Sequence, residues 1–92
     1  MTRILVVDDE PQILRAVERT LLARDFRVET ATDGRAAVGV VRDLEPDLVV
    51  LDLNLPHVDG LTACREIRRF SRVPILVLSV RAAEGEKVAL LD

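Results

Sequence analysis

Three aspartates at the ends of apolar runs are the residues of this 92-residue chain best suited to chemistry. Asp8 and Asp9 follow one run, and Asp52 follows another. Carboxylates brought together repel one another, which costs stability unless a proton or a cation compensates. Oxygen ligands suit a hard cation, and Mg²⁺ accepts a few carboxylates while keeping waters that a phosphate oxygen can replace. A carboxylate can also act as a nucleophile and form an aspartyl phosphate, so these residues indicate phosphoryl transfer.

Short apolar runs without alternation must position these aspartates. They occur at 3–7, 48–51 and 75–79 and are rich in β-branched and aliphatic residues. Their length suits strands, and the lack of alternation is typical of parallel strands buried on both faces. The run at 27–31 is more polar and predicts an edge strand.

Apolar residues at helical spacing separate these strands. Pro11 suits the first turn of a helix over 11–23, and the acids before it favour a helix N-terminus. A turn at 33–34 precedes a second helix that runs to Leu44, and Gly60 leads into a third helix on whose apolar face Cys64 is expected. Residues 84–91 are expected to form the first turns of a further helix.

This alternation predicts an α/β fold: a flavodoxin-like, doubly wound parallel sheet with strand order 2-1-3-4, the fifth strand and helix being absent. Residues 1–92 are expected to form one domain. The winding reverses between the strands at 3–7 and 48–51, so Asp8, Asp9 and Asp52 should meet at one crevice. Ser79 ends the neighbouring strand, where its hydroxyl could bind a phosphate oxygen.

The composition argues against several classes of protein. A formal charge of −3 opposes nonspecific binding to nucleic acid or to an anionic membrane. A single cysteine cannot form an internal disulfide, so a reducing compartment is expected. No signal peptide and no stretch of membrane-spanning length are seen, so we expect a cytoplasmic protein.

Three motifs together resemble one known family. They are Val-Val-Asp-Asp-Glu-Pro at 6–11, Leu-Asp-Leu-Asn-Leu-Pro at 51–56 followed by Asp59-Gly60, and Pro-Ile-Leu-Val-Leu-Ser at 74–79. With this spacing the whole chain resembles the receiver domain of two-component response regulators. Residues 79–81 and 87–92 look most like regulators of Kdp-type potassium uptake, in the winged-helix group of transcription factors.

The resemblance implies a role for each residue of the crevice. Asp52 would accept a phosphoryl group from the phosphohistidine of a sensor histidine kinase, and thereby control a transcriptional output. Asp9 would ligate Mg²⁺ directly, Asp8 would act mainly through metal-bound water, and Asn54 would offer its backbone carbonyl. Ser79 would be the switch hydroxyl that moves toward the phosphoryl group. Such a protein is a substrate and a switch, not an enzyme.

The chain departs from the family pattern at its C-terminal end. Receiver domains continue into a fifth strand that carries a lysine paired with the phosphate, whereas the only lysine here is Lys87, within the helix expected at 84–91. The chain is therefore expected to be a receiver incomplete at its C-terminus. A phosphorylation-impaired interaction module stays open as an alternative, and so does a small phosphohydrolase, which would need a substrate pocket and an acid–base residue.

The missing fifth strand would also leave the strand at 75–78 with a flat, apolar edge. Unpaired edges of this kind promote pairing with another chain. We therefore expect a homodimer or a segment-exchanged oligomer, in addition to a kinase partner.

Plainer interpretations exist for each of these residues. Asp8 and Asp9 could be ordinary helix-start acids, and Asp52 and Asn54 could be turn formers. A strand-end serine such as Ser79 is commonly a local turn hydroxyl. Taken together, the pattern of these residues favours a phosphoryl-transfer site over the plainer interpretations. His57 lies in a polar loop and is given no role, and Cys64 is expected to be a small core residue.

Overall fold

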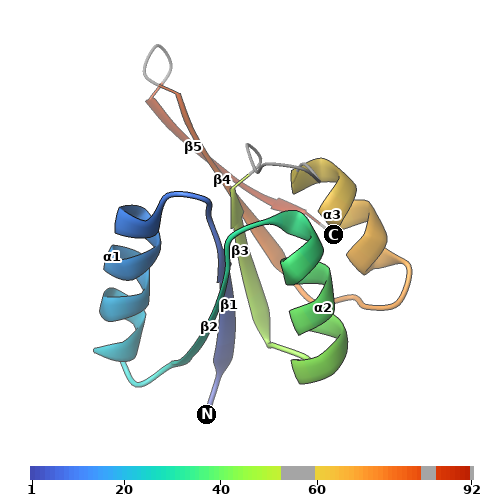
Figure 1. The fold of residues 1–92 in the computed structure, drawn as a ribbon, viewed down its shortest axis with the longest axis horizontal. Helices are drawn as coiled ribbons and strands as arrows, with labels where there is room; N and C mark the ends of the chain where they lie inside the picture. Colours follow the sequence, from blue (N-terminus) through green and yellow to red (C-terminus); the bar gives the residue numbers. More distant parts are fainter. Residues whose placement is uncertain (53–59, 82–84, 92) are drawn as a thin grey trace.

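The computed structural model describes residues 1–52, 60–81 and 85–91 (Figure 1). Its elements alternate as the sequence predicts up to the fourth strand. They are β1 (Arg3–Val7), α1 (Pro11–Leu22), β2 (Arg27–Ala31), α2 (Gly34–Leu44), β3 (Leu48–Asp52), α3 (Gly60–Arg68), β4 (Ile75–Arg81) and β5 (Gly85–Leu91).

One sheet in the order β2-β1-β3-β4-β5 forms the centre of the fold. The first four strands are parallel, which confirms the predicted doubly wound sheet and its order 2-1-3-4. Figure 1 shows α1 on one side of the sheet and α2 with α3 on the other. Right-handed crossovers between parallel strands produce this two-sided cover.

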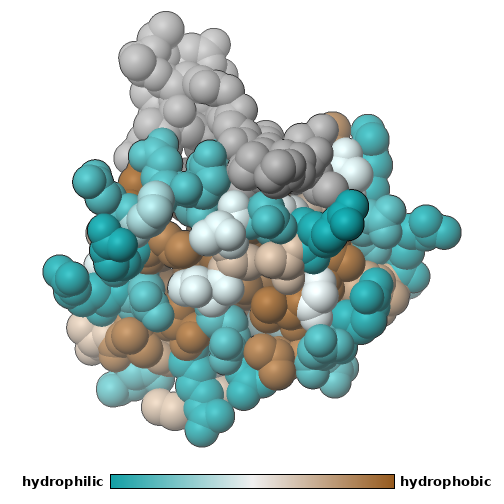
Figure 2. Space-filling view, viewed as in Figure 1, coloured by the Kyte–Doolittle hydropathy of each residue, from teal (hydrophilic) through white to brown (hydrophobic). Residues whose placement is uncertain are grey.

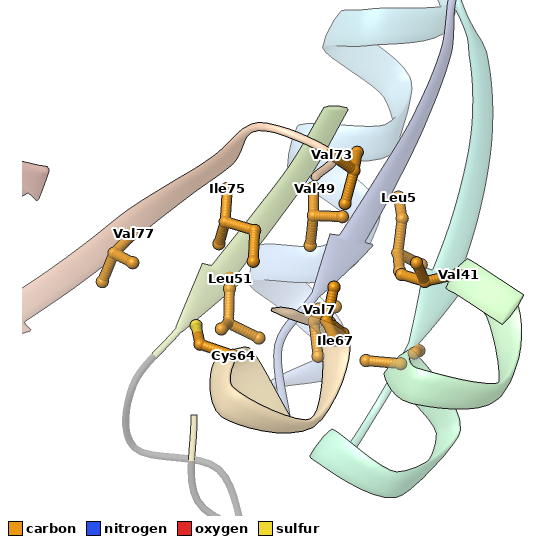
Figure 3. Close-up of a cluster of buried hydrophobic side chains, with 12 residues drawn as sticks. Leu5, Val7, Val41, Val49, Leu51, Cys64, Ile67, Val73, Ile75 and Val77 are labelled. Carbon is orange, nitrogen blue, oxygen red and sulfur yellow. The ribbon is translucent and has the colours of Figure 1, made fainter. Parts of the chain in front are cut away.

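β3 shows why its sequence lacks alternation. Successive side chains of a strand point to opposite faces, and here both faces are buried. Val49 and Leu51 are 0% exposed and belong to the core under α2 and α3, whereas Val50 belongs to the core under α1. Figure 3 shows Leu51 in the first of these cores, close to Cys64 and Ile67 of α3.

Cys64 is a core residue, as its position on the apolar face of α3 predicts. It is buried within the core under α2 and α3 and forms no disulfide. Burial raises the pKa of its thiol, and the nearby Arg68 lowers it by a smaller amount. A buried thiol with a raised pKa is a poor nucleophile, so Cys64 acts in packing.

The helix starts follow local chemistry. Pro11 occupies the first turn of α1, where its missing N–H costs no hydrogen bond. Asp33 caps α2 by accepting a hydrogen bond from the Ala36 N–H at 2.8 Å, and for this reason the helix begins at Gly34. It ends at Leu44, and the next residue, Glu45, caps it in the left-handed conformation with φ 47°.

The helix expected at 84–91 is wrong: Gly85–Leu91 form β5. This strand pairs antiparallel with β4 in a register that runs from Ile75↔Leu91 to Arg81↔Gly85. The backbone groups on the outer edge of β4 need partners, and the pairing supplies them at the cost of a local helical preference. A fifth strand is therefore present, but it runs against the other four.

β5 also changes the predicted edge of the sheet. Residues 75–78 are not an uncovered edge, because all of them pair with β5. The outer edge at this side of the sheet belongs to β5 instead. Self-association as a homodimer or by segment exchange stays a prediction. The unpaired edge of β4 that suggested it is paired with β5 in the structure.

The face of the molecule in Figure 2 is mainly polar. Figure 2 shows hydrophilic side chains around the rim of this view, with hydrophobic side chains in separate patches between them. Isolated exposed apolar residues such as Leu61 and Leu22 are ordinary on a folded surface. In the part of the chain that the structure describes, no helix is both long and apolar enough to cross a membrane.

Candidate functional site

The three aspartates meet at the carboxyl end of two neighbouring strands. β1 and β3 pair in parallel as far as Val7↔Leu51, so Asp8 and Asp52 are the next residues of their strands. One carboxylate oxygen from each of Asp8, Asp9 and Asp52 can be chosen so that all lie within 4.8 Å of one another. The predicted convergence of the three residues is confirmed. It occurs at the reversal of winding, where open α/β sheets place their ligands.

Two hydrogen bonds hold Asp8 in position. Its backbone N–H donates to the Ala31 carbonyl at 3.1 Å, which extends the pairing of β1 with β2 by one residue. Its Oδ1 accepts a hydrogen bond from the Glu10 N–H at 2.8 Å. The Asp8 side chain thus closes a turn between β1 and α1, and Asp9 lies within this turn. The hydrogen bond from the Glu10 N–H could not be predicted from the sequence, because a backbone donor can come from almost any residue type.

Exposure increases from Asp8 outward. Asp8 is buried, with 9% of its surface exposed, Asp52 is intermediate and Asp9 is exposed. Burial is the largest cause of a raised pKa at Asp8. The Glu10 N–H lowers that pKa, while the negative charges of Asp52, Asp9 and Glu10 raise it. The site thus holds a carboxylate whose charge is disfavoured until a cation compensates it.

Asp8→Asn is expected to stabilise the metal-free chain at neutral pH and raise Tm by a few degrees. The folded-state pKa of Asp8 lies above the ordinary value of 3.8, so the folded chain holds this proton more tightly than the unfolded chain. The stability linked to this proton is fully present below 3.8 and is lost as the pH rises through the folded-state pKa. An asparagine has no charge to lose and still accepts from Glu10.

Thermal unfolding in the presence of a chelator, at neutral pH and below pH 3.8, measures this difference. The gain should disappear at the acidic pH. Asp43→Asn, on the exposed side of α2, is the control and should change Tm little. A destabilised Asp8→Asn chain at neutral pH would contradict the account.

The donor set fits Mg²⁺. All three side chains offer carboxylate oxygens, the ligands that a small hard cation prefers, and no sulfur or imidazole ligand joins them among the described residues. Burial, and then repulsion by the neighbouring acids, raise the pKa of Asp8, and a divalent cation at this cluster would offset both effects.

The other predicted site residues are placed only in part. Asn54 and His57 lie outside the described residues. Ser79 belongs to β4 and follows Leu78, which pairs with Asp52. Its backbone therefore lies near the same ends of the strands as the three aspartates. Lys87, expected on a helix, belongs to β5 and pairs with Ser79.

A family profile identifies the family of this chain. The profile of the response regulator receiver domain matches residues 4–92. The chain belongs to the receiver domain family. The predicted resemblance, read from three motifs, is confirmed over almost the whole chain.

Curated relatives of this receiver are regulators that are much longer than it. It is 42% identical over 92 residues to the transcriptional regulatory protein KdpE of Mycobacterium tuberculosis, covering all of this chain and 41% of that protein. It is 44% identical over 91 residues to the response regulator MprA of Mycolicibacterium vanbaalenii, covering 98% of this chain and 39% of that protein. The predicted likeness to Kdp-type regulators is confirmed, and this chain is similar to MprA to about the same degree. The receiver thus spans about two fifths of the length of these relatives.

Solved receiver structures share the fold. The BeF3-activated N-terminal receiver domain of Klebsiella pneumoniae RstA superposes with a TM-score of 0.83 at 32% identity, over 90% of this chain and 71% of that one. The chemotaxis response regulator CheY4 of Vibrio cholerae gives a TM-score of 0.84 at 33% identity, over 89% of this chain and 71% of that one.

Proposed function

We propose that this receiver accepts a phosphoryl group on Asp52 from the phosphohistidine of a sensor histidine kinase, and that it thereby controls a transcriptional output. The observation that carries the proposal is the meeting of Asp8, Asp9 and Asp52, with oxygens within 4.8 Å, at the end of β1 and β3. The names of the relatives KdpE and MprA support a regulatory output.

Asp52 is the nucleophile of choice among the three acids. It ends a central strand that pairs with β1 on one side and β4 on the other, so the backbone that carries its carboxylate is held in place. A carboxylate oxygen of Asp52 would attack phosphorus while the bond from phosphorus to the histidine nitrogen breaks and its electron pair returns to the imidazole. Positioning and charge neutralisation supply most of the catalysis in such a transfer.

Asp8 and Asp9 would hold Mg²⁺ together with Asp52 and the backbone carbonyl of Asn54. When bound, Mg²⁺ supplies charge neutralisation for the phosphoryl oxygens. Asp8 is fixed by the Glu10 N–H, so this wall of the site is set before any partner arrives. The Ser79 hydroxyl is proposed as the switch group that binds a phosphoryl oxygen and biases a two-state equilibrium.

In this proposal the domain is a substrate and switch, not an enzyme. Its partner is the kinase, and the segment itself does not bind nucleic acid, in keeping with its net charge of −3. The proposed location is the cytoplasm, which suits a single buried cysteine without a disulfide.

One observation favours a second candidate, an interaction module with impaired phosphorylation. The family pattern places a phosphate-pairing lysine on a parallel fifth strand, whereas the only lysine of this chain is Lys87, on an antiparallel one. Loss of a cation that pairs with the phosphate would weaken the transfer but would leave the acid cluster in place.

Mg²⁺ affinity is expected to weaken as the pH falls, because the ligands must be deprotonated to bind. Asp8 should protonate at a higher pH than an ordinary carboxyl, since its pKa is raised. Isothermal titration with Mg²⁺ over a series of pH values measures this directly. Asp9→Asn should weaken binding at neutral pH by about tenfold or more, the scale of a lost ligand contact.

Asp47→Asn is the matched control for this titration, because Asp47 lies before β3, at the opposite end from Asp52. It should bind Mg²⁺ as the unaltered chain does. Affinity that stays constant down to acidic pH would reject the acid cluster as the metal site.

A further inference from the structure

We propose that the groove between α2 and α3 is a docking site for an acidic helix of a partner protein. The groove has a volume of about 520 Å³. Its walls are Arg35, Val38, Gly39 and Arg42 on α2, and Thr62 and Glu66 on α3. The two helices lie side by side on one face of the sheet (Figure 1), whereas the aspartates lie at the ends of the strands.

Two guanidinium groups give the α2 wall its charge. Arg35 and Arg42 are seven residues apart, so they lie on one face of α2, about 10 Å apart along its axis. Both are exposed, and neither has an ion pair among the residues that the structure describes. The Arg42 guanidinium lies over the Phe70 ring, 5.1 Å from its centroid, and this contact holds it at one end of the groove.

Gly39 lies on the same wall between the two arginines. Glycine inside a helix is less favourable than alanine, so its presence within α2 calls for a structural or functional explanation. A Cβ added at Gly39 would meet nothing within 4 Å, so packing within the described chain does not demand a glycine. The missing side chain leaves room for the backbone of another molecule to come close to α2.

These features match a helix better than a compact anion. A helix laid along α2 repeats its side chains with the same spacing, so acids at positions i and i+7 would reach Arg35 and Arg42 together. The planar fork of each arginine suits a carboxylate, and a small residue between the two acids would pack on Gly39. Docking of a helix in a groove between helices is a common mode of recognition.

Glu66 on the opposite wall limits what can bind. It would repel an acid on that side and would accept a hydrogen bond from an amine or an N–H. The chain as a whole carries −3 and does not attract an acidic partner over a distance. Recognition therefore depends on the local arginine pair, and the expected partner is acidic on one face only.

The test uses an alanine-based helical peptide with glutamates at i and i+7, and a matched peptide with glutamines there. Each is titrated into the ¹⁵N-labelled 92-residue chain. The Gly39 amide signal should shift and saturate with the glutamate peptide. Affinity for the glutamine peptide should be lower by about tenfold or more, because charge-assisted bonds are lost.

Variants locate the site. Arg35→Glu should weaken binding of the glutamate peptide by about tenfold or more and should favour a peptide with arginine at the facing position. Gly39→Leu should abolish binding of both peptides by filling the groove. Arg15→Glu, on α1 across the sheet, is the control and should leave the affinity unchanged.

The proposal would be overturned by no saturable binding, by equal affinity for the two peptides, or by an Arg35→Glu chain that is folded by circular dichroism and binds normally. Shifts at Gly39 that appear without peptide and grow with protein concentration would also overturn it, since the occupant would then be a second copy. Asp52 is not involved, so labelling of Asp52 should be the same in Arg35→Glu and the unaltered chain.

Discussion

Leu51→Ala is expected to lower the free energy of unfolding by about 2–5 kcal/mol. Leu51 is 0% exposed and lies in the core that joins β1, β3 and β4 to α2 and α3 (Figure 3). Removing its branched end would leave a cavity among side chains that cannot all move to fill it. A domain of this size has a stability of only about 5–15 kcal/mol, so a large share of it would be lost.

Urea unfolding followed by circular dichroism measures this loss, with Leu61→Ala as the matched control. Leu61 lies on α3 with 48% of its surface exposed, so its truncation removes little buried area and should cost less than about 1 kcal/mol. Equal losses in the two variants would contradict the assignment of the core to this face of the sheet.

Asp52→Asn is expected to abolish the Mg²⁺-dependent labelling of the chain by acetyl phosphate. The asparagine amide keeps the shape of the side chain but has no carboxylate oxygen to attack phosphorus. Intact mass spectrometry of the treated chain measures the label. The unaltered chain should gain the mass of one phosphoryl group, and this gain should vanish when Mg²⁺ is removed by a chelator.

Asp47→Asn is the control for this prediction, because it makes the same chemical change just before the start of β3. The Asp47 Oδ2 accepts a hydrogen bond from the Arg3 N–H at 2.8 Å, and the asparagine oxygen can do the same. Labelling should be unchanged in this variant. Undiminished labelling of Asp52→Asn would show that the phosphoryl group goes elsewhere.

Much of the sheet could be predicted because its strands are buried on both faces. A run such as 48–51 can be apolar throughout only where two layers of helices cover it, and Val49, Val50 and Leu51 show this arrangement. The order of the parallel strands then determines which strand ends are neighbours. Asp8, Asp9 and Asp52 could therefore be brought together by topology alone.

The last segment could not be predicted in the same way. The acids at 84 and 86 suit the start of a helix, and nothing local in residues 84–91 shows that they can pair with the edge of a strand. β5 forms only by pairing antiparallel with β4, so its structure depends on a contact between two segments and not on its own sequence. The contribution of the Glu10 N–H to Asp8 was missed for a similar reason, because any residue type can supply a backbone donor.

Locating the phosphoryl group on the chain would test the central claim most directly. After treatment with acetyl phosphate and Mg²⁺, borohydride reduces an aspartyl phosphate to an alcohol, and peptide mass spectrometry identifies the altered residue. The account predicts reduction at Asp52 and nowhere else. Reduction at Asp8 or Asp9, or a chain with no reduced residue despite bound Mg²⁺, would contradict it.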